Sequence, residues 1–153
     1  MLNIRKLDDG FAAAGQLGPT DMAEVRSLGY EAVINNRPDE EIGADQATSV
    51  ENRKAAEAAG LTYYYLPMTP DTLSRHLLDA FQKALDTSDG PVLAHCTSGA
   101  RSTALWAIVR CAYSGSDIDD ILRRAKAAGY ELDNLKPVIE KHRAAQDSNE
   151  DAS

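Results

Sequence analysis

The sequence predicts an α/β fold in which helices cover a central sheet of mostly parallel strands. Segments typical of strands and of helices alternate through the middle of the chain, and strands connected through a helix pair in parallel. The 153 residues suffice for one domain with a substantial core and leave little room for a second. We therefore expect one domain over residues 1–145 with four or five strands, followed by a disordered acidic tail over residues 146–153.

Five short apolar segments are the strand candidates. The first two are joined by a turn that ends at Gly10, and the third is an apolar run typical of a buried strand. The fourth contains three successive tyrosines, and Pro67 and Pro70 frame its exit. The fifth follows another turn and ends at His95. The expected strands are residues 3–6, 11–14, 31–35, 61–68 and 92–95.

Six helix candidates alternate with these strands. Residues whose side-chain oxygens can cap a helix N-terminus precede several of them: Thr20, Thr48 with Glu51, and Ser116. Glycines suited to the residue after a helix follow three of them: Gly29, Gly60 and Gly129. The expected helices are residues 21–28, 49–59, 72–85, 100–113, 117–127 and a last one from 133.

Composition and charge exclude several classes of function. The formal net charge is −8, which disfavours nucleic acids and anionic membranes as partners, because basic residues nowhere cluster. No apolar run approaches the ~20 residues of a membrane span, and from the first residues of the sequence we expect no secretory leader. Cys96 and Cys111 would lie roughly 20 Å apart on an intervening helix, too far for a disulfide. Two free thiols favour a reducing, cytoplasmic setting, and no residue grouping predicts a metal or another cofactor.

Residues 92–102 are the segment that predicts chemistry. An apolar run ends at His95-Cys96, four small or polar residues follow, and Arg101-Ser102 begin a helical pattern. Ligands of α/β sheets bind at the carboxyl ends of strands, where Cys96 is expected. A helix N-terminus lowers the pKa of a cysteine thiol, and the amides of a tight loop bind anions. The pattern predicts a cysteine nucleophile beside an oxyanion site.

Each residue of this loop has a predicted role. Gly99 permits a positive φ, and the Arg101 guanidinium is a planar fork that matches an oxyanion. Ser102 is expected to donate to the Cys96 thiolate or to help expel it, and His95 to brace the loop through its ring nitrogens. The alternative, an inert buried thiol, leaves Gly99 and Arg101 unexplained. The predicted oxyanion-binding residues are Thr97, Ser98, Gly99, Ala100 and Arg101.

Polar residues after the third strand are expected near this loop. Asn36 and Arg37 follow that strand, whose carboxyl end should lie beside the nucleophile. Arg37 would attract an anion or brace the loop; the alternative is a surface arginine in a polar turn. Asp39, Glu40 and Glu41 are interpreted as a solvated acidic run.

The His95–Ser102 segment resembles the phosphate-binding loop of protein tyrosine and dual-specificity phosphatases, which reads His-Cys, five residues, Arg, then Ser or Thr. More of the chain resembles the phosphatase-like domain of the beta-lactamase hydrolase-like protein family. The resemblance implies a small dual-specificity phosphatase-like fold and a Cys96 thiophosphate intermediate. The matching segments are residues 4–6, 14–17, 33–39, 65–68 and 91–106.

Two departures from the phosphatase pattern leave the reaction open. Only four residues separate Cys96 from Arg101, which removes one amide and is similar to the loop of rhodanese sulfurtransferases. Proteins of the resembled family are also often named as sulfurtransferases. The position that matches the general-acid aspartate holds Pro70, and Asp71 is one residue late. Asp71 is either the acid or part of the cap of the following helix.

The expected function is a cofactor-free hydrolase of phosphate esters with Cys96, Arg101, Asp71 and Ser102 as catalytic residues. The first alternative is a sulfurtransferase that carries a persulfide on Cys96, and the second is a module that binds oxyanions without catalysis. A small phosphorylated or sulfane-sulfur compound is expected as substrate rather than a phosphoprotein. The sequence does not determine the oligomeric state.

Overall fold

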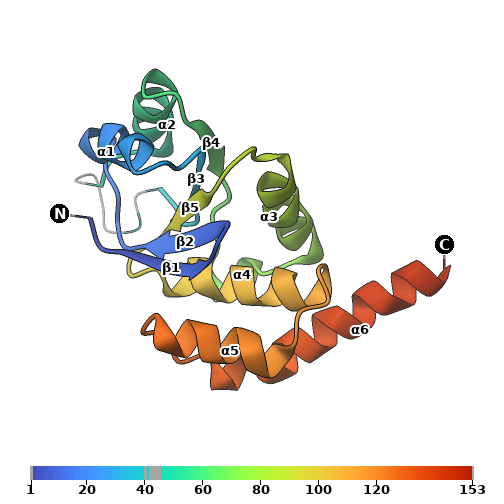
Figure 1. Cartoon of the computed structure of the whole chain (residues 1–153). Helices are drawn as coiled ribbons and strands as arrows, with labels where there is room; N and C mark the ends of the chain where they lie inside the picture. Colours follow the sequence, from blue (N-terminus) through green and yellow to red (C-terminus); the bar gives the residue numbers. More distant parts are fainter. Residues whose placement is uncertain (1, 40, 42–45, 153) are drawn as a thin grey trace.

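The predicted strands form one five-stranded sheet in the computed structural model, which describes residues 2–39, 41 and 46–152 (Figure 1). Across the sheet the order is β1 (Ile4–Asp8), β2 (Phe11–Ala14), β5 (Val92–His95), β3 (Ala32–Asn35) and β4 (Thr62–Tyr65). Strands β1 and β2 pair antiparallel, and the other three pairings are parallel. The expected α/β class and parallel-rich sheet are confirmed.

Helices cover both faces of the sheet (Figure 1). On one face lie two helices, α1 (Met22–Ser27) and α2 (Ser49–Ala58). On the other lie α3 (Arg75–Thr87), α4 (Ala100–Ala112), α5 (Ile118–Ala127) and α6 (Lys136–Ala152). Helix α6 extends to Ala152 and so includes residues 146–152 of the expected acidic tail, whose disorder stays a prediction.

The helix caps agree with the sequence at α2 and differ at α3 and α5. The Thr48 hydroxyl accepts the Glu51 N–H at 3.1 Å, as predicted. Helix α3 begins at Arg75 and is capped by Ser74, because Pro70–Thr72 form a separate 3₁₀ turn. Asp117, not Ser116, caps α5. The amide of Ser116 is still bonded to the carbonyl of Arg110, so the preceding turn includes it.

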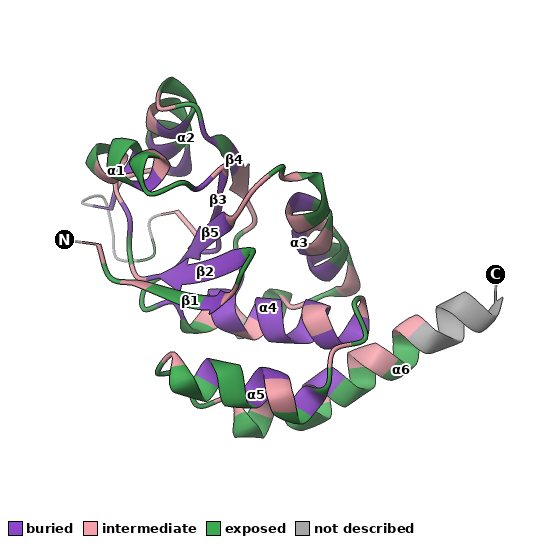
Figure 2. Cartoon of the chain, in the orientation of Figure 1, coloured by how far each residue is buried: buried purple, intermediate pink, exposed green. Residues whose placement is uncertain are grey.

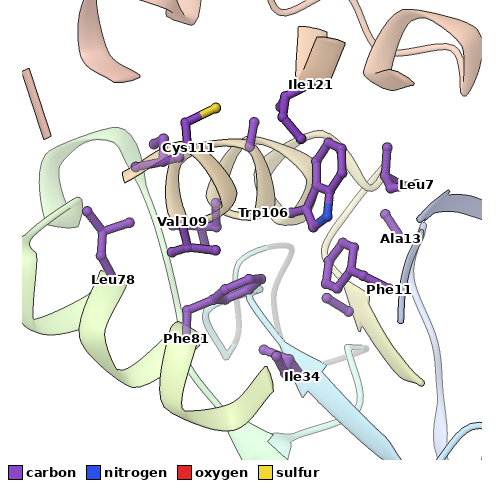
Figure 3. Close-up of a cluster of buried hydrophobic side chains, with 14 of the residues drawn as sticks. Leu7, Phe11, Ala13, Ile34, Leu78, Phe81, Trp106, Val109, Cys111 and Ile121 are labelled. Carbon is purple, nitrogen blue, oxygen red and sulfur yellow. The ribbon is translucent and has the colours of Figure 1, made fainter. Parts of the chain in front are cut away.

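The two faces of the sheet bury two hydrophobic clusters (Figure 2). Strands β2, β3 and β5 are buried along their whole length, so their successive side chains enter opposite clusters. In the larger cluster Phe11 stacks on Trp106 with ring centroids 6.2 Å apart, and Phe81 lies tilted against Phe11 (Figure 3). The smaller cluster, under α1 and α2, includes Leu93.

Strand register brings four strand ends to one edge of the sheet. Ala14, His95 and Asn35 are aligned partners across β2, β5 and β3, and Asn35 is aligned with Tyr65 of β4. Each is the last residue of its strand. The chain therefore leaves β2, β3, β4 and β5 at the same level, and Cys96 lies at the centre of this edge.

Candidate active site

The Cys96 loop is a tight turn that aims the backbone N–H of Gly99 at the sulfur. The Gly99 amide donates to Cys96 Sγ at 3.1 Å. Gly99 has φ +94°, and a Cβ at this position would overlap the Tyr130 hydroxyl. That hydroxyl in turn donates to the Ser98 carbonyl at 3.1 Å. A glycine is therefore required both by the backbone conformation and by the close approach of Tyr130.

Unpaired amides line the same loop. Within the described part of the chain, the N–H groups of Thr97, Ser98 and Arg101 have no protein acceptor. They lie at or just before the first turn of α4, whose dipole is positive at this end. Cys96 is 1% exposed, whereas Thr97 and Ser98 are exposed at the rim. The loop thus has a buried sulfur, free amide donors and an open outer side, which is the arrangement of an anion site.

The Arg101 side chain lies across the loop and is held at two points. Its Nη1 donates to the Met68 carbonyl at 3.2 Å, and its Nη2 to Glu41 Oε1 at 2.8 Å. The hydrogen bond to Glu41 is the first cause that raises the pKa of Arg101, and the charge of the same carboxylate adds to it. Arg101 is about a quarter exposed, at 26%. It is therefore charged and accessible beside the sulfur.

Glu41 is a charged site residue that the sequence analysis missed. It was expected in a solvated acidic run, but its carboxylate contacts Arg101, Arg37 at 3.2 Å and the Thr97 hydroxyl at 3.1 Å. The pKa of Glu41 is lowered, and the largest cause is the hydrogen bond from Arg101. Asp39 is not merely solvated either, because it accepts the Ser49 amide and hydroxyl at 2.7 Å each. Glu40 lies outside the described residues. The spacing of Glu41 from Arg37 is the one sequence signal for this contact, and it is weak outside a helix.

Arg37 and Asn36 lie at this edge, as predicted. Arg37 is 3% exposed, which excludes the surface-arginine alternative. Its guanidinium donates to Glu41 and to the Gln16 side-chain oxygen. Asn36 is fully buried, and its backbone N–H donates to the His95 carbonyl at 2.8 Å. Asn36 therefore supports the end of β5 beside the Cys96 loop, and Arg37 lies buried at the same edge of the sheet.

Ser102 and His95 differ from their expected contacts. The buried Ser102 hydroxyl donates to Asn36 Oδ1 at 2.8 Å and not to Cys96. His95 does not brace the loop through its ring, because neither ring nitrogen has a hydrogen-bond partner in the part of the chain that the structure describes. Its carbonyl makes the bond to Asn36 instead. Burial, and secondarily the Arg37 charge, lowers the pKa of His95 to about 3, so the ring is neutral.

Asp71 is not brought into the cluster. It is exposed in the turn Pro70–Thr72, and within the described residues its carboxylate has no hydrogen-bond or ion-pair partner. It does not cap α3, since Ser74 does. It follows Met68, the residue that contacts Arg101, by three positions.

The second cysteine is unsuited to chemistry at this site. Cys111 is fully buried in α4, and burial raises the pKa of its thiol to about 11. Among the described residues, no three His, Cys, Asp or Glu side chains are placed to hold a metal ion. No helix in the described ranges has the length and apolar character needed to cross a membrane.

Comparison with known proteins identifies the family. Residues 3–113 match the family described as "Beta-lactamase hydrolase-like protein, phosphatase-like domain". A relative of that name from Agrobacterium fabrum is 30% identical over 141 residues, which cover 92% of this chain and 32% of the relative. One from Xylella fastidiosa is 29% identical over 140 residues, with the same coverage. The chain thus spans about a third of the length of these curated relatives.

Solved structures agree with this result. A crystal structure of a proposed phosphatase from Neisseria meningitidis superposes with a TM-score of 0.80 at 33% identity, covering 94% of this chain and all of the other. TpbA of P. aeruginosa has a TM-score of 0.64 at 18% identity, over 95% and 91% of the two chains, and shares the fold alone. The fold is that of the protein tyrosine phosphatases. The chain belongs to the family of beta-lactamase hydrolase-like phosphatase-like domains.

Proposed function

We propose that this protein is a cysteine-dependent phosphatase that hydrolyses small phosphate monoesters with Cys96 as the nucleophile. The observation that carries the proposal is the Gly99 N–H bond to Cys96 Sγ at the N-terminus of α4. A backbone donor fixed on sulfur stabilises a thiolate, which is the reactive form. The free amides and the Arg101 guanidinium beside it are suited to the nonbridging oxygens of a phosphoryl group.

The proposed reaction has two displacements at phosphorus. The Cys96 thiolate attacks, an S–P bond forms, and the P–O bond to the leaving group breaks with protonation of the leaving oxygen. Water then attacks the thiophosphate, and orthophosphate leaves as the thiolate is restored. Arg101 and the loop amides hold the equatorial oxygens through both steps. Asp71 is the proposed proton donor to the leaving oxygen, which requires the Pro70–Thr72 turn to approach the bound substrate.

A small substrate is favoured by the size of the loop. With four residues between Cys96 and Arg101, the cradle has one amide fewer than a phosphatase loop of five. A structural neighbour, TpbA, is known in complex with phosphotyrosine, and the yeast phosphatase SIW14 in complex with citrate. Both ligands are small anions, which supports the same class here. The two unpaired cysteines favour a reducing compartment such as the cytoplasm.

Kinetics with para-nitrophenyl phosphate test this function. Cys96→Ser should abolish Cys96-dependent turnover, and Arg101→Ala should lower kcat/KM by about 100-fold or more, because each removes a group that contacts the phosphoryl group. Cys111→Ala is the matched control, since it removes the other thiol from the core and should retain kcat. Circular dichroism verifies folding of each variant. Turnover that persists in folded Cys96→Ser would overturn the assignment.

The short loop also favours a second candidate, transfer of sulfane sulfur. The Cys96 thiolate would attack the outer sulfur of thiosulfate, release sulfite and pass the sulfur to a thiol or cyanide. Mass spectrometry after thiosulfate should then show one added sulfur atom on Cys96. Parallel measurement of phosphate and thiosulfate turnover decides between the two by the larger kcat/KM. A folded protein that binds phosphate but turns over neither would be an oxyanion-binding module.

A further inference from the structure

One carboxylate oxygen already accepts hydrogen bonds from both guanidinium groups beside Cys96. Glu41 Oε1 accepts from Arg101 at 2.8 Å, from the Thr97 hydroxyl at 3.1 Å and from Arg37 at 3.2 Å. The three donors come from α4, from the Cys96 loop and from the exit of β3. Donors from two segments that are far apart in the sequence, the Cys96 loop with the first turn of α4 and the exit of β3, therefore converge on a single anionic atom.

We propose that the Glu41 carboxylate is an internal ligand of the oxyanion site, that substrate displaces it, and that Arg37 joins Arg101 in binding a doubly charged oxyanion. The proposal rests on the proposed function for the location of the substrate. It adds a second guanidinium to the site and assigns Glu41 as the group that sets the affinity for anions.

The exchange is chemically matched. Carboxylate and phosphate oxygens bind a guanidinium fork in the same way, so a phosphoryl oxygen can take the place of Oε1. Glu41 is 25% exposed, so its carboxylate is already partly hydrated and enters water without full desolvation of the site. Its lowered pKa agrees with a carboxylate that is ionised at neutral pH and competes as an anion.

Neither arginine depends on Glu41 alone for its orientation. Arg101 keeps its bond to the Met68 carbonyl, and Arg37 keeps its bond to Gln16. Because these acceptors are uncharged protein groups, the two guanidiniums stay in place while their charges become available. The second contacts therefore favour Glu41 as a replaceable ligand over Glu41 as the group that positions the arginines.

The charges select for a dianion. Arg37 is 3% exposed, and Glu41 is its single charged partner among the described residues. Departure of Glu41 without replacement would leave a buried cation unpaired, which is costly. A singly charged anion only restores the charge that Glu41 supplied. A doubly charged oxyanion neutralises both guanidiniums and so displaces the carboxylate more effectively.

Titration with inorganic phosphate tests the proposal on the full chain. Binding is followed at pH 7.5 and low ionic strength by the amide resonances of the Cys96 loop. Glu41→Gln keeps the size of the side chain and removes its charge, so the Kd for phosphate should fall by about threefold to tenfold. Glu41→Ala should tighten binding in the same direction.

Glu57→Gln is the matched control. Glu57 lies on α2, pairs with Arg53 at 3.8 Å and is 61% exposed, so its substitution makes the same change in net charge far from the loop. The Kd of Glu57→Gln for phosphate should stay within twofold of the Kd of the unsubstituted protein. In the Glu41→Gln background, Arg37→Gln should remove the gain, with the melting temperature as the test of folding.

The outcomes separate this proposal from the proposed function. Weaker or unchanged phosphate binding in both Glu41 variants would overturn it, because Glu41 would then position the arginines or be a bystander. An equal gain in Glu57→Gln would also overturn it, as a net-charge effect. If the Glu41 variants bind phosphate more tightly but the unsubstituted protein turns over no phosphate ester, Glu41 is still an internal ligand of the site. The proposed phosphatase function is then wrong.

Discussion

His95 is a buried neutral base, one residue before Cys96, and its ring nitrogens have no hydrogen-bond partner among the described residues. Its pKa is lowered to about 3 in the folded protein, first by burial and then by the Arg37 charge. An unfolded histidine binds a proton near pH 6.5. Between these values the unfolded state holds one proton more, so His95 makes the free energy of unfolding decrease as the pH falls, and its contribution is fully present above about pH 6.5.

We therefore expect His95→Asn to flatten the acid dependence of stability. From about pH 6 down to pH 4, the unsubstituted protein should lose roughly 1.4 kcal/mol per pH unit more than the variant, as one proton requires. Urea unfolding at several pH values measures this slope. A loss of packing in the variant would lower the free energy of unfolding equally at every pH and would leave the slope unchanged. His76→Gln, on the exposed surface of α3, is the control. Parallel slopes for His95→Asn and the unsubstituted protein would contradict the assignment.

At the scale of elements, Asn36 joins the end of β3 to three other parts of the fold. Its side-chain amide donates to the Leu66 carbonyl at 2.8 Å, and its side-chain oxygen accepts from Ser102 of α4. Its backbone bonds to His95 and to Met68. The ends of β3 and β5, the segment after β4 and the first turn of α4 are thus tied through one residue.

A double-mutant cycle measures this tie. Asn36→Ala leaves the buried Ser102 hydroxyl without an acceptor and should lower the free energy of unfolding by about 1–3 kcal/mol. Ser102→Ala in the Asn36→Ala background should cost far less than Ser102→Ala alone, giving a coupling of about 0.5–2 kcal/mol. Chemical denaturation measures the free energy of unfolding of the unsubstituted protein, the two single variants and the double variant. Additive losses would mean that Ser102 and Asn36 do not stabilise each other.

The sequence predicts the parts of the site that depend on residues close together in the chain. The β5–loop–α4 unit, the positive φ of Gly99 and the placement of Arg101 all follow from residues within a few positions of Cys96. The partners within distant segments were not predictable: Asn36 was expected near the loop, but not its bond to Ser102 across 66 positions, nor that of Glu41 to Arg101 across 60. Spacing in the sequence says nothing about such pairs until the register of the parallel sheet is known.

At the scale of the whole molecule, the two hydrophobic clusters share one sheet. Strand β5 is central, since it pairs with β2 on one side and β3 on the other. Leu93 enters the cluster under α1 and α2, while its neighbours Val92 and Ala94 enter the cluster under α3 and α4. Loss of packing on one face therefore destabilises the strand on which the other face depends.

Leu93→Ala should consequently unfold both faces together. The side chain is fully buried, and its truncation should lower the free energy of unfolding by about 2–5 kcal/mol. Trp106, the sole tryptophan, reports on the opposite face, where it stacks on Phe11. Its fluorescence midpoint in urea should shift as far as the far-UV circular dichroism midpoint, as two-state unfolding requires. Leu28→Ala, at a residue that is 57% exposed, should shift neither by more than the equivalent of about 0.5 kcal/mol. If the tryptophan midpoint stays in place while the circular dichroism midpoint moves, the two faces unfold independently. Packing under α1 and α2 would then not stabilise the opposite face, where α4 begins beside Cys96.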